Sequence, residues 1–117
     1  MKILLVEDHG ETRTVLTGLL GRSGHEVAAA GNVQEALQLL EAAPFEVLIC
    51  DIGLPGANGY DVARALRSDP ETHSTYMIAM TGYGQDEDKR MAITAGFDQH
   101  LTKPIAIDAL EHLLTRG

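Results

Sequence analysis

The chain has 117 residues, of which 17 are acidic and 9 are basic, so its formal net charge at pH 7 is −8. This length and a hydrophobic content of 44% are typical of one globular domain with a real core, which excludes a disordered chain. The acidic excess argues against direct binding to nucleic acids. The single cysteine, Cys50, excludes an internal disulfide, and no apolar run is long enough for membrane insertion. We therefore expect one cytoplasmic domain over residues 1–117.

Short apolar runs alternate with amphipathic stretches from the start of the chain, which predicts alternating strands and helices. A strand is expected over residues 3–6, followed by a helix that ends at Gly21 or Gly24. The predicted apolar face of this helix comprises Val15, Leu16, Leu19 and Leu20. A second, weaker strand is expected over residues 25–30.

The next helix begins after Asn32, a residue typical of helix N-caps, and Glu35 follows three residues later as in a capping box. Its predicted apolar face comprises Val33, Ala36, Leu37 and Leu40. The third strand, residues 45–50, is apolar throughout its last four residues, Val47 to Cys50, and ends at Asp51. Such a run favours a central strand that is covered on both faces.

The remaining elements follow the same two periodicities. They are helices over residues 60–67, 87–95 and 107–115 and strands over residues 76–80 and 99–102. Five strands that alternate with five helices predict an α/β fold in which helices cover both faces of a parallel sheet. At this size the leading candidate is a flavodoxin-like three-layer sandwich with the strand order 2-1-3-4-5, in which ligands bind at the carboxyl ends of the strands.

Polar residues stand at the ends of four of the five predicted strands. They are Glu7 and Asp8 after the first, Asp51 after the third, Thr81 after the fourth and Lys103 after the fifth. A parallel sheet brings these ends to one edge, so the residues should converge although almost a hundred positions separate them. Each residue alone is more typical of a turn or a helix cap than of a ligand, and for the pair Glu7-Asp8 the two interpretations are equally typical. The combination is what indicates a site.

Three carboxylates at one edge require positive charge. Two like charges about 4 Å apart repel by ~4 kcal/mol at an effective dielectric constant near 20, and Lys103 supplies a single positive charge. A hard divalent cation with oxygen ligands meets this requirement, and Mg²⁺ is the expected ion; no His/Cys pair has the spacing of a zinc site. Asp51, alone at the end of a central strand, is the candidate nucleophile toward a phosphoryl group, whose oxygens Lys103 and Thr81 would contact.

These residues resemble the receiver domain of two-component response regulators, and the resemblance extends over essentially all 117 residues. It is carried by the segments LLVED at residues 4–8, CDIGLP at 50–55, Gly59, MTG at 80–82 and the pair Lys103-Pro104. The resemblance implies that Asp51 accepts a phosphoryl group from the phosphohistidine of a histidine kinase or a histidine phosphotransfer domain. It implies a Mg²⁺ site made by Glu7, Asp8, Asp51 and the backbone carbonyl of Gly53, and a cis peptide bond between Lys103 and Pro104.

The resemblance also implies a conformational switch, in which Thr81 moves toward the phosphoryl group and a second residue follows it. That second position, three residues before Lys103, is often Tyr or Phe in the family and is His100 here. A strand-end histidine without a switching role is the alternative. The domain would act on an output domain or a target protein. Its sequence motifs most resemble those of receivers in hybrid histidine kinases.

Two other functions remain open at this point. A Mg²⁺-dependent phosphohydrolase with an aspartyl-phosphate intermediate commonly has a second Asp two residues after the nucleophile, where this chain has Gly53. A flavodoxin-like FMN-binding module requires a phosphate-binding loop after the first strand, where this chain has the anionic pair Glu7-Asp8. Both alternatives are therefore disfavoured, and the domain is expected to catalyse only its own phosphorylation and dephosphorylation.

Overall fold

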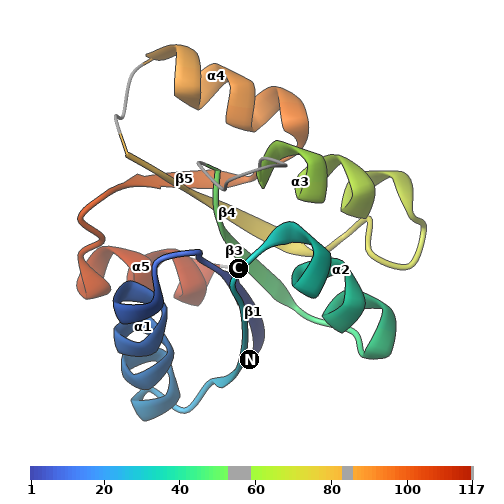
Figure 1. The fold of residues 1–117 in the computed structure, drawn as a ribbon. Helices are drawn as coiled ribbons and strands as arrows, with labels where there is room; N and C mark the ends of the chain where they lie inside the picture. Colours follow the sequence, from blue (N-terminus) through green and yellow to red (C-terminus); the bar gives the residue numbers. More distant parts are fainter. Residues whose placement is uncertain (53–58, 83–85, 117) are drawn as a thin grey trace.

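The computed structural model describes residues 1–52, 59–82 and 86–116, which form a five-stranded parallel sheet between two layers of helices (Figure 1). The strands are β1 (Lys2–Val6), β2 (Glu26–Ala30), β3 (Val47–Asp51), β4 (Tyr76–Thr81) and β5 (Gln99–Thr102). The helices are α1 (Gly10–Arg22), α2 (Val33–Ala42), α3 (Gly59–Ser68), α4 (Asp86–Ala95) and α5 (Ile107–Arg116). The strand order is β2-β1-β3-β4-β5, so the predicted flavodoxin-like topology is confirmed.

Alternation along the inner strands builds two separate core layers. On β1, Ile3 and Leu5 face the layer that contains α1 and α5, whereas Leu4 and Val6 face the layer that contains α2, α3 and α4. All five residues of β3 are buried, as expected for a central strand that has helices on both of its faces. This double burial explains why its sequence is continuously apolar up to Asp51.

The predicted apolar faces of the first two helices are wider than the faces that the sheet covers. Val15 leaves 57% of its surface exposed and Leu37 leaves 37%, although both were assigned to apolar faces. In each case the neighbouring residue, Leu16 or Ala36, is buried instead. Adjacent helical positions differ by about 100° around the helix axis. When one of two adjacent side chains packs against the sheet, the other therefore points toward solvent.

Local signals fix where the helices begin and end. Asn32 caps α2, as predicted: its Oδ1 accepts a hydrogen bond of 2.8 Å from the backbone N–H of Glu35. Beyond the end of α1, Gly24 has a φ of +93°, a left-handed conformation that favours glycine.

The Lys103–Pro104 peptide bond is cis, as the resemblance implied. Within the described residues no helix has both the length and the apolar character that crossing a bilayer requires.

Candidate functional site

The carboxyl ends of three strands bring charged side chains to one edge of the sheet. Glu7 and Asp8 directly follow β1, Asp51 is the last residue of β3, and Lys103 directly follows β5. Because β1 and β3 are paired neighbours, the acidic pair and Asp51 stand side by side at this edge. Lys103 reaches them from the far side of β4, and 96 sequence positions separate it from Glu7.

The Lys103 ammonium group links two of the three carboxylates. Its Nζ lies 2.7 Å from Asp51 Oδ2 and 3.1 and 3.2 Å from the two carboxylate oxygens of Glu7. The backbone places the lysine, because its N–H donates a hydrogen bond of 2.7 Å to the carbonyl oxygen of Thr81 at the end of β4. The lysine is thus anchored at the strand ends and directed into the acidic cluster.

The acidic cluster itself has the chemistry of a site for a hard cation. Carboxylate oxygens of Glu7, Asp8 and Asp51 all lie within 4.8 Å of one another. Glu7 and Asp51 are buried and Asp8 is exposed, so the cluster opens to solvent on the side of Asp8. Oxygen ligands with one open side match the preference of Mg²⁺, which binds one or two carboxylates and keeps several waters. The residues therefore fit the predicted ion.

Burial of Glu7 makes its negative charge costly without a second cation. Its side chain is only 1% exposed, and burial together with the hydrogen bond and negative charge of Asp51 raises its pKa from 4.5 to about 7, against the opposing effect of Lys103. Burial alone would lower the pKa of Lys103, but its hydrogen bonds and charge pairing with Asp51 and Glu7 raise it overall. Lys103 therefore remains a cation, and its single positive charge is shared between the carboxylates of Glu7 and Asp51.

The raised pKa of Glu7 predicts that the metal-free protein loses stability as the pH rises. Because the pKa of Glu7 is about 7 in the folded state and 4.5 when unperturbed, the folded state binds the proton more tightly between these values. The loss begins near pH 4.5 and is complete above pH 7, and it amounts to about 3 kcal/mol in the free energy of unfolding. Urea denaturation with a chelator at ~pH 5 and ~pH 8 measures it. The Glu7→Gln variant removes this titration, so equal pH dependence in variant and wild type would contradict the prediction.

Two further residues shape the surroundings of Asp51. Thr81 is 1% exposed, and its Oγ1 has no hydrogen-bond partner among the described residues, so this hydroxyl is available to an incoming group. Gly59 begins α3 directly against the strand: a Cβ atom there would lie 2.7 Å from the carbonyl oxygen of Asp51 and 2.9 Å from Cys50 Sγ. Only glycine lets α3 pack this closely beneath the site.

Some sequence predictions fall elsewhere. Gly53, whose carbonyl was expected to bind the metal, lies outside the described residues. His100, the predicted second switch residue, is half-buried on β5, where it pairs with Ala79 of β4. Cys50 is a buried free thiol whose pKa burial raises, which is typical of an inert core residue.

Two contacts near the site were not anticipated from the sequence. His9 caps α1 through its Nδ1, which accepts a hydrogen bond from the backbone N–H of Thr12. Arg13 donates a hydrogen bond from Nη1 to the backbone carbonyl of Glu7. Histidine is not among the preferred N-cap residues, and a side-chain contact to a backbone oxygen six positions away leaves no pattern in the sequence.

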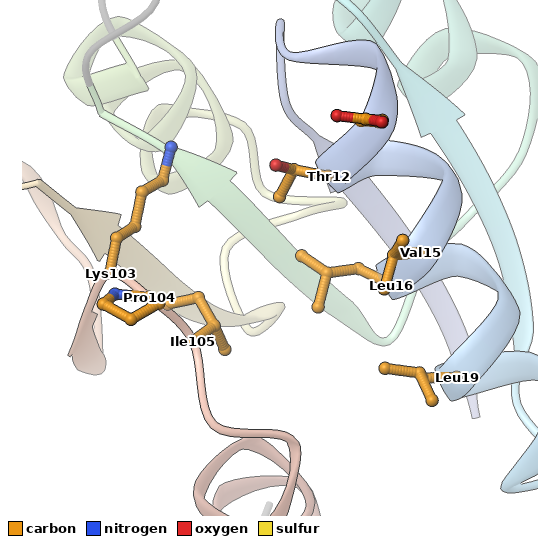
Figure 2. A pocket seen from close by; sticks show the side chains of 8 residues that line it. Thr12, Val15, Leu16, Leu19, Lys103, Pro104 and Ile105 are labelled. Atoms are coloured by element: carbon orange, nitrogen blue, oxygen red, sulfur yellow. The ribbon is translucent and has the colours of Figure 1, made fainter.

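A largely apolar groove of about 650 Å³ lies beside the site. One wall is α1, and the other is the segment after β5 that carries Lys103, Pro104 and Ile105 (Figure 2). The α1 wall is formed by Glu11, Thr12, Val15, Leu16 and Leu19. Figure 2 shows Lys103 at one end of this groove and Leu19 at the other, so the apolar surface leads away from the acidic cluster.

Comparison with known proteins assigns this arrangement to a family. The family model of the response regulator receiver domain matches this sequence over residues 3–115. The chain belongs to this family. As a receiver it is a phosphoacceptor domain of two-component signalling, a class that is generally not counted among the enzymes and that implies a histidine kinase as partner.

Relatives of this receiver include regulators and kinase domains. It is 35% identical to the two-component response regulator PhoP of Pseudomonas aeruginosa, over 95% of the receiver but only 48% of PhoP. Vibrio cholerae chemotaxis protein CheY4 has a TM-score of 0.93 and 29% identity, with 98% of this chain and 96% of that chain covered. The receiver domain of the sensor histidine kinase PA1611 of Pseudomonas aeruginosa has a TM-score of 0.90 and 28% identity. The match covers 98% of this chain and 94% of that chain. That structure holds a magnesium ion in its active site cleft. The receiver described here has an acidic cluster of Glu7, Asp8 and Asp51 that could hold a metal ion.

Proposed function

We propose that residues 1–117 form one cytoplasmic receiver domain in which Asp51 accepts a phosphoryl group from a phosphohistidine, in a Mg²⁺-dependent reaction that shifts the domain to an active conformation. The observation that carries this proposal is the ammonium group of Lys103, which lies 2.7 Å from Asp51 Oδ2 beside two further carboxylates. A cation placed on the nucleophile itself is suited to a reaction that adds negative charge there.

The proposed transfer is a displacement at phosphorus. A carboxylate oxygen of Asp51 forms the new O–P bond while the N–P bond of the phosphohistidine breaks, and the imidazole nitrogen leaves with the electron pair of that bond. Lys103 stays next to the acceptor and offsets charge on the transferred oxygens, and the Thr81 hydroxyl, which lacks a partner among the described residues, donates to one of them. Glu7, Asp8 and Asp51, with the carbonyl of Gly53 as the resemblance implies, would hold Mg²⁺, which when bound neutralises charge on the phosphoryl group.

A small phosphodonor distinguishes this function from that of a phosphohydrolase or a flavin carrier. A receiver incubated with the donor and Mg²⁺ should gain one phosphoryl group per chain, visible in the intact mass. Continuous release of phosphate from a small substrate without a trapped acyl phosphate would favour the phosphohydrolase. A flavin absorbance spectrum in the purified protein would favour the FMN carrier.

We further propose that the apolar groove between α1 and Pro104 receives the partner that carries the phosphohistidine. A protein donor must bring its imidazole next to Asp51, and this groove is the apolar surface that begins at Lys103 (Figure 2). Val15 lines this groove and leaves 57% of its surface exposed, so it offers apolar surface to a partner.

Replacement of Val15 by Glu should therefore slow transfer from a protein donor and leave transfer from a small donor unchanged. A charge placed in an apolar contact typically costs ~1 to ~3 kcal/mol, so the rate from a phosphorylated histidine domain should fall roughly ten- to a hundredfold. Initial rates with both donors provide the measurement. Ile93→Glu on α4, where Ile93 is 65% exposed, is the matched control at a distant surface. Equal slowing with both donors would contradict the docking role.

Thr81 and His100 are proposed as the switch, which the sheet register supports. Ala79 pairs with His100 and Thr81 pairs with Thr102, so Thr81 and His100 extend from the same face of neighbouring strands. That face carries the core layer of α4, because Ala79 packs with residues of that helix. Movement of Thr81 toward Asp51 would leave space on this face, next to His100.

A phosphoryl mimic with Mg²⁺ should therefore change amide chemical shifts along β4, α4 and β5 as well as around Asp51. One charged hydrogen bond of roughly 1.5–3 kcal/mol shifts a two-state population by about tenfold to a hundredfold, so a graded response is expected. The His100→Ala variant should lose the distant changes and keep those around Asp51. Shifts confined to the surroundings of Asp51 in the wild type would exclude this surface as the output.

A further inference from the structure

The peptide unit that joins Glu7 to Asp8 is held by a side chain from outside the sheet. Strand β1 ends at Val6, and the N–H of Glu7 still donates to the carbonyl oxygen of Ala30 at 3.0 Å. The carbonyl of Glu7 lies one peptide further on, beyond the last strand residue. Arg13 Nη1 donates to this oxygen at 2.9 Å. Both backbone groups of Glu7 are thus hydrogen-bonded, one by β2 and the other by α1.

Helix α1 anchors the backbone of Arg13, and its guanidinium lies beside two glycines. Arg13 lies in the first turn of α1, where its N–H donates to the carbonyl oxygen of His9. A Cβ at Gly31 would lie 3.0 Å from Nη1, and one at Gly10 would lie 3.8 Å from Nη2. Neither glycine has a positive φ, so the backbone does not require glycine at these positions. A side chain at Gly31 would therefore crowd the guanidinium, whereas a Cβ at Gly10 would make only ordinary van der Waals contact with it.

We propose that Arg13 is a positioning residue for the divalent-cation site. The Glu7–Asp8 peptide plane links two of the three carboxylate residues of the cluster, so its orientation sets the direction of both side chains. Mg²⁺ requires near-octahedral geometry at about 2.0–2.1 Å from its ligands, and small rotations of this plane therefore weaken binding. By holding the Glu7 carbonyl, Arg13 keeps both carboxylates directed at one point. This inference rests on the proposed Mg²⁺-dependent function.

A purely electrostatic role of Arg13 would have the opposite effect. A positive charge beside an acidic cluster repels a divalent cation, so its removal would strengthen Mg²⁺ binding if charge alone mattered. A positioning role predicts weaker binding after the same substitution. The sign of the change in affinity therefore separates the two roles.

The experiment measures Mg²⁺ affinity by calorimetric titration of the full chain, with the thermal stability of each metal-free protein recorded in parallel. Arg13→Met should bind Mg²⁺ roughly tenfold more weakly than the wild type, as is typical when a group that orients a metal ligand is removed. Arg13→Lys, which keeps the charge and one donor on a differently shaped side chain, should lie between them. Arg22→Met removes the same charge from the exposed last turn of α1 and should bind like the wild type.

The outcomes distinguish this inference from the proposed function. A wild type that does not bind Mg²⁺ would overturn the proposed function, and the inference with it. A wild type that binds Mg²⁺ while Arg13→Met binds it equally well or more tightly would overturn the inference alone. If Arg13→Met does not fold, the comparison of Arg13→Lys with the wild type decides: weaker binding supports positioning, and equal binding contradicts it.

Discussion

Replacement of Asp51 by Asn should abolish phosphorylation of the receiver. The carboxamide keeps the shape of the side chain but lacks the anionic oxygen that attacks phosphorus in the proposed transfer, and it removes the carboxylate that lies 2.7 Å from Lys103. We expect labelling by a small phosphodonor with Mg²⁺ to fall by at least ~10²-fold, as expected when a nucleophile is removed. Phosphoryl incorporation followed by intact mass over time provides the measurement.

A matched control separates the loss of the nucleophile from the loss of a charge. Asp61→Asn makes the same chemical change on an exposed carboxylate of α3, whose side chain is 53% exposed. This control should be phosphorylated at the rate of the wild type. Undiminished labelling of Asp51→Asn would show that another residue is the acceptor.

Replacement of Asp8 by Asn should weaken Mg²⁺ binding strongly and leave the fold intact. Asp8 is the exposed member of the acidic cluster, so its carboxylate is available to the proposed cation site and has no role in the core. We expect a roughly ten- to hundredfold weaker affinity, equivalent to ~1.4 to ~3 kcal/mol. The metal-free variant should be as stable as the wild type or more stable, because one of three mutually repelling charges is gone. Equal affinities of variant and wild type in a calorimetric titration would argue against the site.

The convergence of the site could be predicted because it depends on topology alone. Once five strands alternate with five helices, a parallel sheet must bring residues 7, 51 and 103 to the same edge, whatever the details of packing. Strand β3 was recognisable for a related reason: burial on both faces requires an unbroken apolar run, and Asp51 is the first residue that departs from it.

Other features depend on distances that a sequence pattern does not contain. Lys103 contacts Glu7 and Asp51 with its ammonium group, and nothing in its sequence surroundings favours Glu7 over its neighbour Asp8. Val15 is exposed and its neighbour Leu16 is buried, and periodicity does not report which of two adjacent apolar positions packs against the sheet. Arg13 reaches a backbone carbonyl, and every residue offers one, so no residue type marks the contact.

The most direct measurement of the central claim is the position of the phosphoryl group on the chain. Phosphorylated receiver would be reduced with borohydride, which converts an aspartyl phosphate to homoserine, and digested, and the modified residue would be identified by peptide mass spectrometry. The proposed function predicts modification at Asp51 and at no other carboxylate. Modification at Glu7 or Asp8, or on a histidine, would contradict it.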